Sequence, residues 1–208
     1  MIQKEIINVK SKTAMIAMLT CMMFIAGCVT RAKLPTSDQN PPPVEAFSNF
    51  SDFELKPIDR GPACDKQHGA DVALNGVENR MHVKLRQLIA NWKAAPNAAV
   101  NVSSKKRTLI IEPICSNAKM MGKGSRMSVG LFGGDSVVIL NVRYKDAESG
   151  KIIADPVFYQ RTNVFSGAFS WGATDQDMLE RMASMIAIYT SKNYESAVGG
   201  PTGLEIKN

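Results

Sequence analysis

The stretch Val138-Ile-Leu-Asn-Val-Arg-Tyr-Lys145 decides the fold. Its apolar side chains fall at positions 138, 140, 142 and 144 and its polar ones at 141, 143 and 145, which is the period of a half-buried β-strand. The turn residues Ala147–Gly150 follow, and Lys151–Arg161 returns as the second arm of a hairpin. Because Pro156 has no backbone N–H to donate to a neighbouring strand, we expect this arm to lie at the edge of the sheet or to contain a bulge.

The elements on either side of this hairpin complete the expected fold. Apolar residues three and four positions apart predict one helix over Asn75–Lys93 and another from the N-cap Thr174 to about Tyr194. A short apolar run in Thr108–Cys115 predicts a buried strand, and Phe47–Pro62 predicts the first strand. The expected buried stripes are Val77, Met81, Leu85, Leu88, Ile89 and Trp92 in the first helix, and Leu179, Met182, Ile186 and Tyr189 in the second.

The order of these elements, β-α-β-β-β-α, predicts an α+β (mixed α/β) fold. Two helices should pack on one face of a mixed sheet. The helix that joins the first two strands allows those strands to be parallel.

The N-terminus has the zones of a secretory signal peptide. Lys4, Lys10 and Lys12 precede an apolar run of thirteen residues, Ala14–Ala26, which only Thr20 interrupts. A helix that spans a bilayer needs about 20 apolar residues, whereas the core of a signal peptide has about 7–15. Residues 1–27 are therefore expected to be a signal peptide.

The end of that run predicts a lipid anchor. Ile25-Ala26-Gly27-Cys28 resembles the lipobox of bacterial lipoproteins, which implies that Cys28 carries lipid, palmitate among it, as the first mature residue. More than one acyl chain anchors such a protein stably to a membrane. The alternative is an ordinary signal peptide that is cut elsewhere and leaves Cys28 unmodified. Val29 stands where many Gram-negative lipoproteins retained in the inner membrane have Asp, so we expect the outer membrane, with the protein facing the periplasm.

The rest of the chain divides into a tether, one domain and a tail. Prolines lie among polar residues in 28–46, which predicts an extended tether after the lipidated cysteine. Residues 47–195 should form a single α/β domain, since 208 residues suit one domain with extensions. Residues 196–208 follow the last helix and contain Gly199-Gly200-Pro201, so we expect a flexible tail.

The charge of the chain bears on its partners. The full sequence has a net charge of +6, and removal of three lysines and one glutamate with residues 1–27 leaves +4. A mild positive charge favours contact with anionic envelope surfaces. Nucleic acid is not an expected partner of an exported chain.

Two cysteines remain in the expected domain. Cys64 and Cys115 are an even pair at the ends of predicted strands, and in an oxidising compartment they could form a disulfide. Such a bridge would contribute about 3–4 kcal/mol through the loop of about 50 residues that it closes. The alternatives are two buried free thiols, or a zinc site with His68 and His82, although no second closely spaced pair of ligands supports zinc. We expect no metal and no cofactor.

A glycine-rich segment between two predicted strands is the candidate partner-binding loop. Apolar residues lie there among basic residues and glycines, a composition found in interaction loops and also in ordinary solvated loops. The candidate residues are Lys119, Met120, Met121, Lys123, Arg126, Leu131 and Phe132.

Three stretches resemble a family of small bacterial lipoproteins, domain-of-unknown-function family 4410. They are Gly124-Ser125-Arg126 leading to Gly133-Gly134-Asp135-Ser136, the hairpin Tyr144–Lys151, and the closing helix Asp177–Asn193. The resemblance covers about Phe50 to Asn193. The hairpin also resembles envelope proteins with a fold like the N-terminal domain of TolB, among them lipoprotein activators of penicillin-binding proteins. These resemblances imply a mixed α/β domain that binds other envelope components, and they bring no catalytic residues.

Two functions follow from these observations. The first is a membrane-anchored periplasmic lipoprotein that acts as a non-catalytic binding or scaffolding module for an envelope protein or polymer. The alternative is a small envelope enzyme acting on cell-wall or lipid polymers. Its candidate acids are Asp135, Asp146 and Asp155, although acids at the ends of hairpins usually serve turns.

Overall fold

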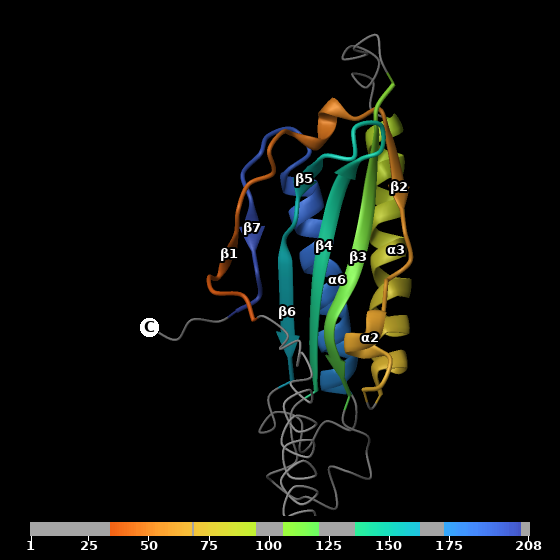
Figure 1. Ribbon diagram of the computed structural model, residues 1–208, viewed down its shortest axis with the longest axis vertical. Helices are drawn as coiled ribbons and strands as arrows, with labels where there is room; N and C mark the ends of the chain where they lie inside the picture. Colours follow the sequence, from red (N-terminus) through yellow and green to blue (C-terminus); the bar gives the residue numbers. More distant parts are fainter. Residues whose placement is uncertain (1–33, 68, 95–105, 121–135, 163–172, 205–208) are drawn as a thin grey trace, which may run out of the picture. The chain divides into compact units, whose positions relative to one another are not determined.

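A computed structural model describes residues 34–67, 69–94, 106–120, 136–162 and 173–204 (Figure 1). The first part contains β1 (Gln39–Asn40), the 3-10 turn η1 (Phe47–Asn49), β2 (Asp52–Leu55), α2 (Gly61–Cys64) and α3 (Ala70–Ala94). The second part contains β3 (Thr108–Lys119), β4 (Val137–Asp146), β5 (Ile152–Ala154), β6 (Val157–Arg161), α6 (Ala173–Lys192) and β7 (Gly200–Pro201).

The main sheet is mixed, as the order of elements predicts. β2 pairs with β3 in parallel, and α3 connects them. β3 pairs with β4 in antiparallel register over most of its length, with a bulge between Cys115 and Asn117. β5 and β6 pair with the other edge of β4, where they form one interrupted arm. The interruption falls at Asp155-Pro156, in agreement with the expected bulge.

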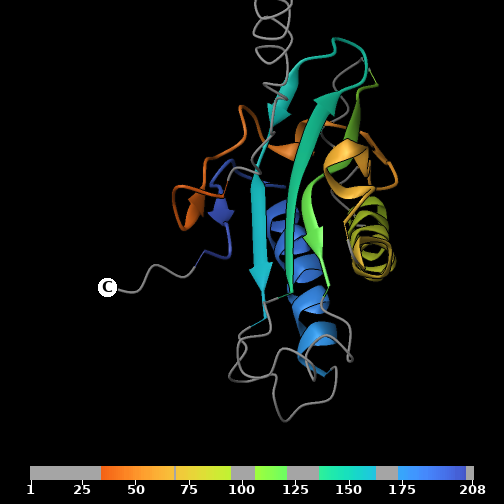
Figure 2. The same ribbon diagram turned by 60° about the horizontal axis from the view of Figure 1, so that its bottom comes forward.

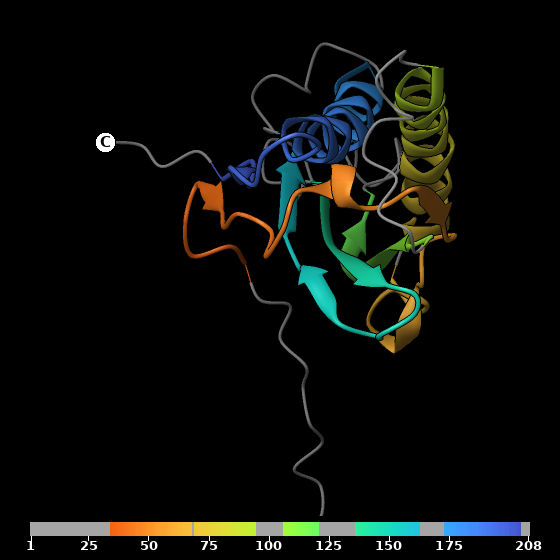
Figure 3. The same cartoon turned by 90° about the horizontal axis from the view of Figure 1, so that it is seen from above.

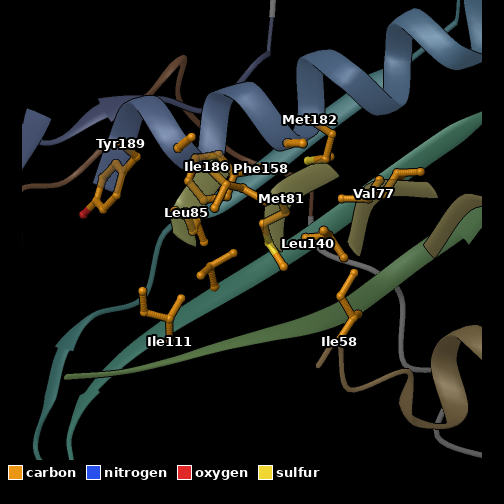
Figure 4. Packing of buried hydrophobic residues seen from close by; sticks show 14 of the residues in the cluster. Ile58, Val77, Met81, Leu85, Ile111, Leu140, Phe158, Met182, Ile186 and Tyr189 are labelled. Atoms are coloured by element: carbon orange, nitrogen blue, oxygen red, sulfur yellow. The ribbon is translucent and has the colours of Figure 1, made fainter. Parts of the chain in front are cut away.

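Both long helices cover the same face of this sheet (Figures 1 and 3). The apolar positions of β4 point to that face, and the helices contribute the predicted stripes Met81, Leu85, Met182 and Ile186 (Figure 4). The α+β class with two helices on one face is therefore confirmed. No helix in the described ranges is long and apolar enough to cross a bilayer.

The centre of the core includes a buried tyrosine of β4. The ring of Tyr144 stacks on Phe47 with centroids 4.7 Å apart, and its hydroxyl is 2.6 Å from Thr190 Oγ1. Because Thr190 donates to the carbonyl of Ile186, the Tyr144 hydroxyl is the donor to Thr190. Burial raises the pKa of this phenol, so it stays neutral.

Some expected boundaries need correction. The first helix begins at Ala70, five residues before the expected Asn75, and Thr174 lies inside α6 and is not its N-cap. The first strand is shorter than Phe47–Pro62, because η1 and α2 occupy the two ends of that range. Gly61 and Pro62 sit in the first turn of α2, where a proline needs no backbone donor.

The predictions of a tether over residues 28–46 and a flexible tail over residues 196–208 are wrong where these segments contain β1 and β7. β1 pairs with β7 in antiparallel register, so the chain near residue 40 lies beside the chain near residue 200 (Figures 1 and 2). Both strands fall in segments that composition predicts to be extended or flexible. The ordered unit therefore includes residues on both sides of the expected 47–195 domain.

Candidate functional site

Asp146, a candidate acid of the enzyme hypothesis, closes the β4–β5 turn. Its side chain is 6% exposed, and its Oδ2 atom accepts from Arg107 Nη2 at 2.6 Å and Nε at 3.1 Å. Its Oδ1 atom accepts from the backbone N–H groups of Glu148 and Ser149. The Arg107 guanidinium and these donors hold the pKa of Asp146 well below its usual range. A general acid needs a raised pKa, so this environment suits a structural role.

Arg107 joins three separate segments at this point. It forms a bidentate salt bridge with Glu45, in which both N···O distances are 2.9 Å. Its guanidinium carbon also lies 4.2 Å from the centre of the Phe50 ring, in a cation–π contact. The same contact lowers the pKa of Glu45. The group Glu45, Arg107 and Asp146 thus fastens the segment before η1 to the ends of β3 and β4. No spacing in the sequence points to Glu45 or Arg107, since 62 residues separate them.

The other two candidate acids do not join this group. Asp155 has a side chain that is 45% exposed at the hairpin interruption, and its carboxylate lies 3.9 Å from Arg143 Nε. Asp135 lies outside the described residues. The contacts of Asp146 and Asp155 therefore give the enzyme hypothesis no support.

Cys64 and Cys115 form a disulfide that joins α2 to β3. Both residues are buried, and their Cα atoms are 6.3 Å apart. Asp59 reinforces this junction, because its N–H donates to the Pro113 carbonyl at 2.8 Å and its carbonyl accepts from Cys115 N–H at 2.7 Å. The sequence left a disulfide, free thiols and zinc open, and the structure contains the disulfide.

The bridge leaves no thiolate of this pair for a metal. The described residues include no group of three or more His, Cys, Asp or Glu side chains placed to hold a metal ion. His82 lies on α3 with its Nε2 atom buried and without a hydrogen-bond partner in the described structure, and His68 lies outside the described residues.

The candidate partner-binding loop is described only at its beginning. Lys119 ends β3 and is the register partner of Val137, so both lie on the sheet face away from the helices. Met120 packs against the core, and its carbonyl oxygen would be 2.8 Å from a Cβ at Gly69. The other five candidate residues of this loop lie outside the described residues: Met121, Lys123, Arg126, Leu131 and Phe132. The lipidation candidate Cys28 also lies outside them.

Lys119 lies on the sheet face away from the helices, which is here called the open face. Residues directly opposite each other in neighbouring strands share a face, so the register shows what this surface carries. Its apolar members are Ile110, Ile114, Val137, Ile139, Val157 and Tyr159. Its charged members include Glu112, Lys119, Arg143, Lys145 and Arg161.

The open face is more apolar than the sequence indicates. The polar residues Asn141, Arg143 and Lys145 predict a solvent-exposed outer side for β4. The apolar residue Ile139 lies on the same side and is only 2% exposed. Lys145 pairs with Glu112 across the strands at 3.2 Å. Ile139 is thus covered within the chain, and the rest of this face mixes partly exposed apolar residues with charged ones, since Glu112 lies between Ile110 and Ile114 along β3. The apolar positions of β3 and β6 could have been found only by knowing which strands pair.

Comparison with known proteins finds only weak similarities among the solved structures reported below. No protein-family model matches the chain, and a search of curated proteins finds no match. A PelC dodecamer from Paraburkholderia phytofirmans matches with 14% identity and a TM-score of 0.40 over 70% of this chain and 93% of that one. A candidate lipoprotein from Caulobacter crescentus matches with 12% identity and a TM-score of 0.32 over 71% and 90%.

A further neighbour is a protein of domain-of-unknown-function family 330 from Xanthomonas campestris. It matches with 12% identity and a TM-score of 0.33, over 70% of this chain and 81% of that one. At these identities and TM-scores the similarities carry no argument about function. The resemblance to family 4410 and to the TolB N-terminal domain is not confirmed and stays a prediction from the sequence.

Proposed function

We propose that this chain is an exported lipoprotein whose domain binds another component of the cell envelope and catalyses no reaction. The observation that carries the proposal is the buried disulfide between Cys64 and Cys115. Disulfides persist in oxidising compartments, where an exported chain folds, and are rare in the cytosol. The signal-like residues 1–27 independently favour export. Lipidation at Cys28 and an outer-membrane position facing the periplasm belong to the proposal and are supported by the lipobox and by Val29.

The open face, together with the candidate loop residues, is the proposed binding surface. Its partly exposed apolar residues, such as Ile114 and Tyr159, can be buried against a partner, while its basic residues attract anionic groups and orient the approach. A protein or polymer of the envelope that carries both apolar and anionic groups would suit this surface. The alternative of an envelope enzyme lacks a comparable observation, because the buried acid Asp146 is already occupied by Arg107 and two backbone donors.

The basic residues of the loop give a direct test. Changing Lys119, Lys123 and Arg126 together to alanine should lower the yield of envelope partners that are captured by cross-linking. The loss should be greatest when the cross-linking is done at low salt, where charge attraction is least screened. The melting temperature should change little, since single surface charges contribute well under about 1 kcal/mol each. Pull-down after cross-linking in the native envelope measures retention, and calorimetry measures melting.

The matched control removes the same charge elsewhere. Lys66, Arg86 and Lys192 are exposed on or beside helices, and their triple replacement by alanine should leave retention unchanged. Equal losses from both triple variants would contradict the proposed surface. Loss of a hydrolytic activity in the Asp135→Asn, Asp155→Asn double variant, with normal binding by the basic variant, would show that the chain is an enzyme. Asp146 stays unchanged in this test because its replacement would disturb the fold.

A further inference from the structure

The two edges of the main sheet differ in what covers them. Along β6, the Thr202 carbonyl accepts from Tyr159 N–H at 2.8 Å. Asn40 donates to the Val157 carbonyl and accepts from Val157 N–H on the same edge. At the other edge, β2 pairs only with β3 among the described strands (Figure 1). An edge strand without such a cover can pair with a strand of another molecule.

The backbone groups of β2 alternate between β3 and the free edge. The N–H groups of Asp52 and Lys56 donate to carbonyls along β3 and just before it, at 3.1 and 3.0 Å, so the even-numbered residues face β3. Phe53 and Leu55 therefore direct their backbone groups to the free edge. Phe53 N–H donates to the Asp52 side chain at 3.0 Å. Leu55 N–H has no acceptor within the described part of the chain, so it can donate to a second strand.

Two exposed side chains of opposite charge lie on either side of Leu55. Glu54 is 48% exposed and Lys56 is 43% exposed. Both belong to the open face, because Glu54 is the register partner of Ile110 and Lys56 follows two residues later. They form an ion pair with each other, but a pair this exposed contributes little to stability. Both side chains can therefore pair with charges on a second strand at little cost.

A second copy of this chain is the strand that these charges fit. Two β2 edges related by a twofold axis run antiparallel, and their free backbone groups meet where odd-numbered residues oppose odd-numbered residues. With Leu55 opposite Leu55, each Glu54 lies opposite the Lys56 of the other copy. A register centred on Glu54 or on Lys56 opposes like charges, and one centred on Phe53 opposes Asp52 to Glu54. The charges therefore favour the register centred on Leu55.

The side of α3 that follows β2 adds apolar surface beside this edge. Glu78 accepts from Ile58 N–H at 2.9 Å, and Lys93 pairs with Asp52 at 2.9 Å, so both residues mark that side of the helix. Ile89 precedes Lys93 by one helical turn and lies three turns after Glu78, which places it on the same side. Ile89 is only half-buried, although the sequence predicts it in the buried stripe. A second copy that covered Ile89 would gain stability from its burial.

We propose that two copies of this chain pair through their β2 edges, in the antiparallel register centred on Leu55. Each Leu55 N–H donates to the Leu55 carbonyl of the other copy, and two Glu54–Lys56 pairs form across the edge. The two sheets become one, and their open faces lie side by side, so an extended partner meets two binding surfaces at once. This pairing requires neither lipidation at Cys28 nor the partner of the proposed function.

Charge reversal in the purified full chain tests the pairing. Sedimentation equilibrium in a detergent of matched density gives the mass of the protein alone, so an acyl anchor does not affect the result. The parent should reach twice the mass of one chain as its concentration rises. Glu54→Lys and Lys56→Glu should each weaken the dimer about tenfold or more, because two attractive pairs become repulsive. Asp155→Lys, which reverses an acid of similar exposure on the hairpin, should leave the dimer unchanged.

Recombining the two weakened variants tests the register. In an equimolar mixture, Glu54→Lys chains should pair with Lys56→Glu chains as tightly as the parent pairs with itself, since every cross-edge pair again joins opposite charges. The double variant Glu54→Lys, Lys56→Glu should regain the affinity of the parent for the same reason. Circular dichroism checks that all variants keep the parent fold, which these exposed positions should allow.

Three results would overturn the proposal. The first is a parent that stays monomeric at every concentration. The second is a dimer that survives both single reversals, which would place the contact on another surface. The third is a mixture that fails to pair although each single variant has lost its dimer, because the charges would then not oppose each other in the expected register.

Discussion

Replacing Cys64 and Cys115 together by alanine should lower the free energy of unfolding by about 4 kcal/mol. The bridge joins residues 51 positions apart, so its loss frees a long loop in the unfolded chain. It also removes the link between α2 and β3. Urea unfolding followed by circular dichroism measures the change, and the parent under reducing conditions should shift to nearly the same midpoint as the double variant.

Thiol labelling gives the matching chemical result. The exported domain, denatured without a reductant, should take up no label at Cys64 or Cys115, and after reduction it should take up one at each. Two reactive thiols before reduction would contradict the bridge. Such a result would also remove the observation that carries the assignment to an oxidising compartment.

Asp146→Ala should lower the free energy of unfolding by about 3–5 kcal/mol at neutral pH. The change leaves Arg107 without one of its two carboxylate partners, and it leaves the N–H groups of Glu148 and Ser149 without their acceptor. Asp155→Ala is the control on the same hairpin. Because that carboxylate is exposed and 3.9 Å from its cation, its loss should change stability by less than about 1 kcal/mol.

The stabilisation from Asp146 should depend on pH with a definite sign. Its pKa is lower in the folded chain than in the unfolded chain, because Arg107 and the backbone donors favour the charged form. The contribution should therefore be complete above the unfolded pKa of about 4, and it should decline as pH falls below that value toward the lower folded pKa. Unfolding measured between neutral and acidic pH should show the parent and Asp146→Ala converging. A constant difference over that range would contradict this role of Asp146.

The hairpin and the two helices were predictable because their signals are local. Alternation over Val138–Tyr144 and the spacing of Met182, Ile186 and Tyr189 depend only on which face of an element is buried. The helix between β2 and β3 allowed the parallel pairing that the structure shows. The early start at Ala70 was missed because the small residues of the first turns, Ala70 and Ala73, are buried but carry little hydrophobic signal.

The pairing of β1 with β7 and the group around Arg107 were not predictable from composition. Asn40 bonds to Val157, which is 117 residues away, and no periodicity records such a contact. Three consecutive prolines beside Asn40 resemble a tether because proline does not donate to a strand. In the fold this segment is held by side chains, and Tyr189 donates to the Pro41 carbonyl at 3.0 Å. The open face was only partly predictable, since its apolar positions on β3 and β6 depend on the register of three strands.

The mass of the N-terminal peptide of the protein from its native membrane tests the central claim most directly. We expect a chain that begins at Cys28 and carries a diacylglyceryl group on the sulfur, and we expect incorporation of labelled palmitate. Cys28→Ala should abolish that labelling and leave uncleaved precursor or released soluble protein. A mature chain that begins elsewhere, with an unmodified Cys28 or with labelling that persists in Cys28→Ala, would contradict the assignment as an envelope lipoprotein.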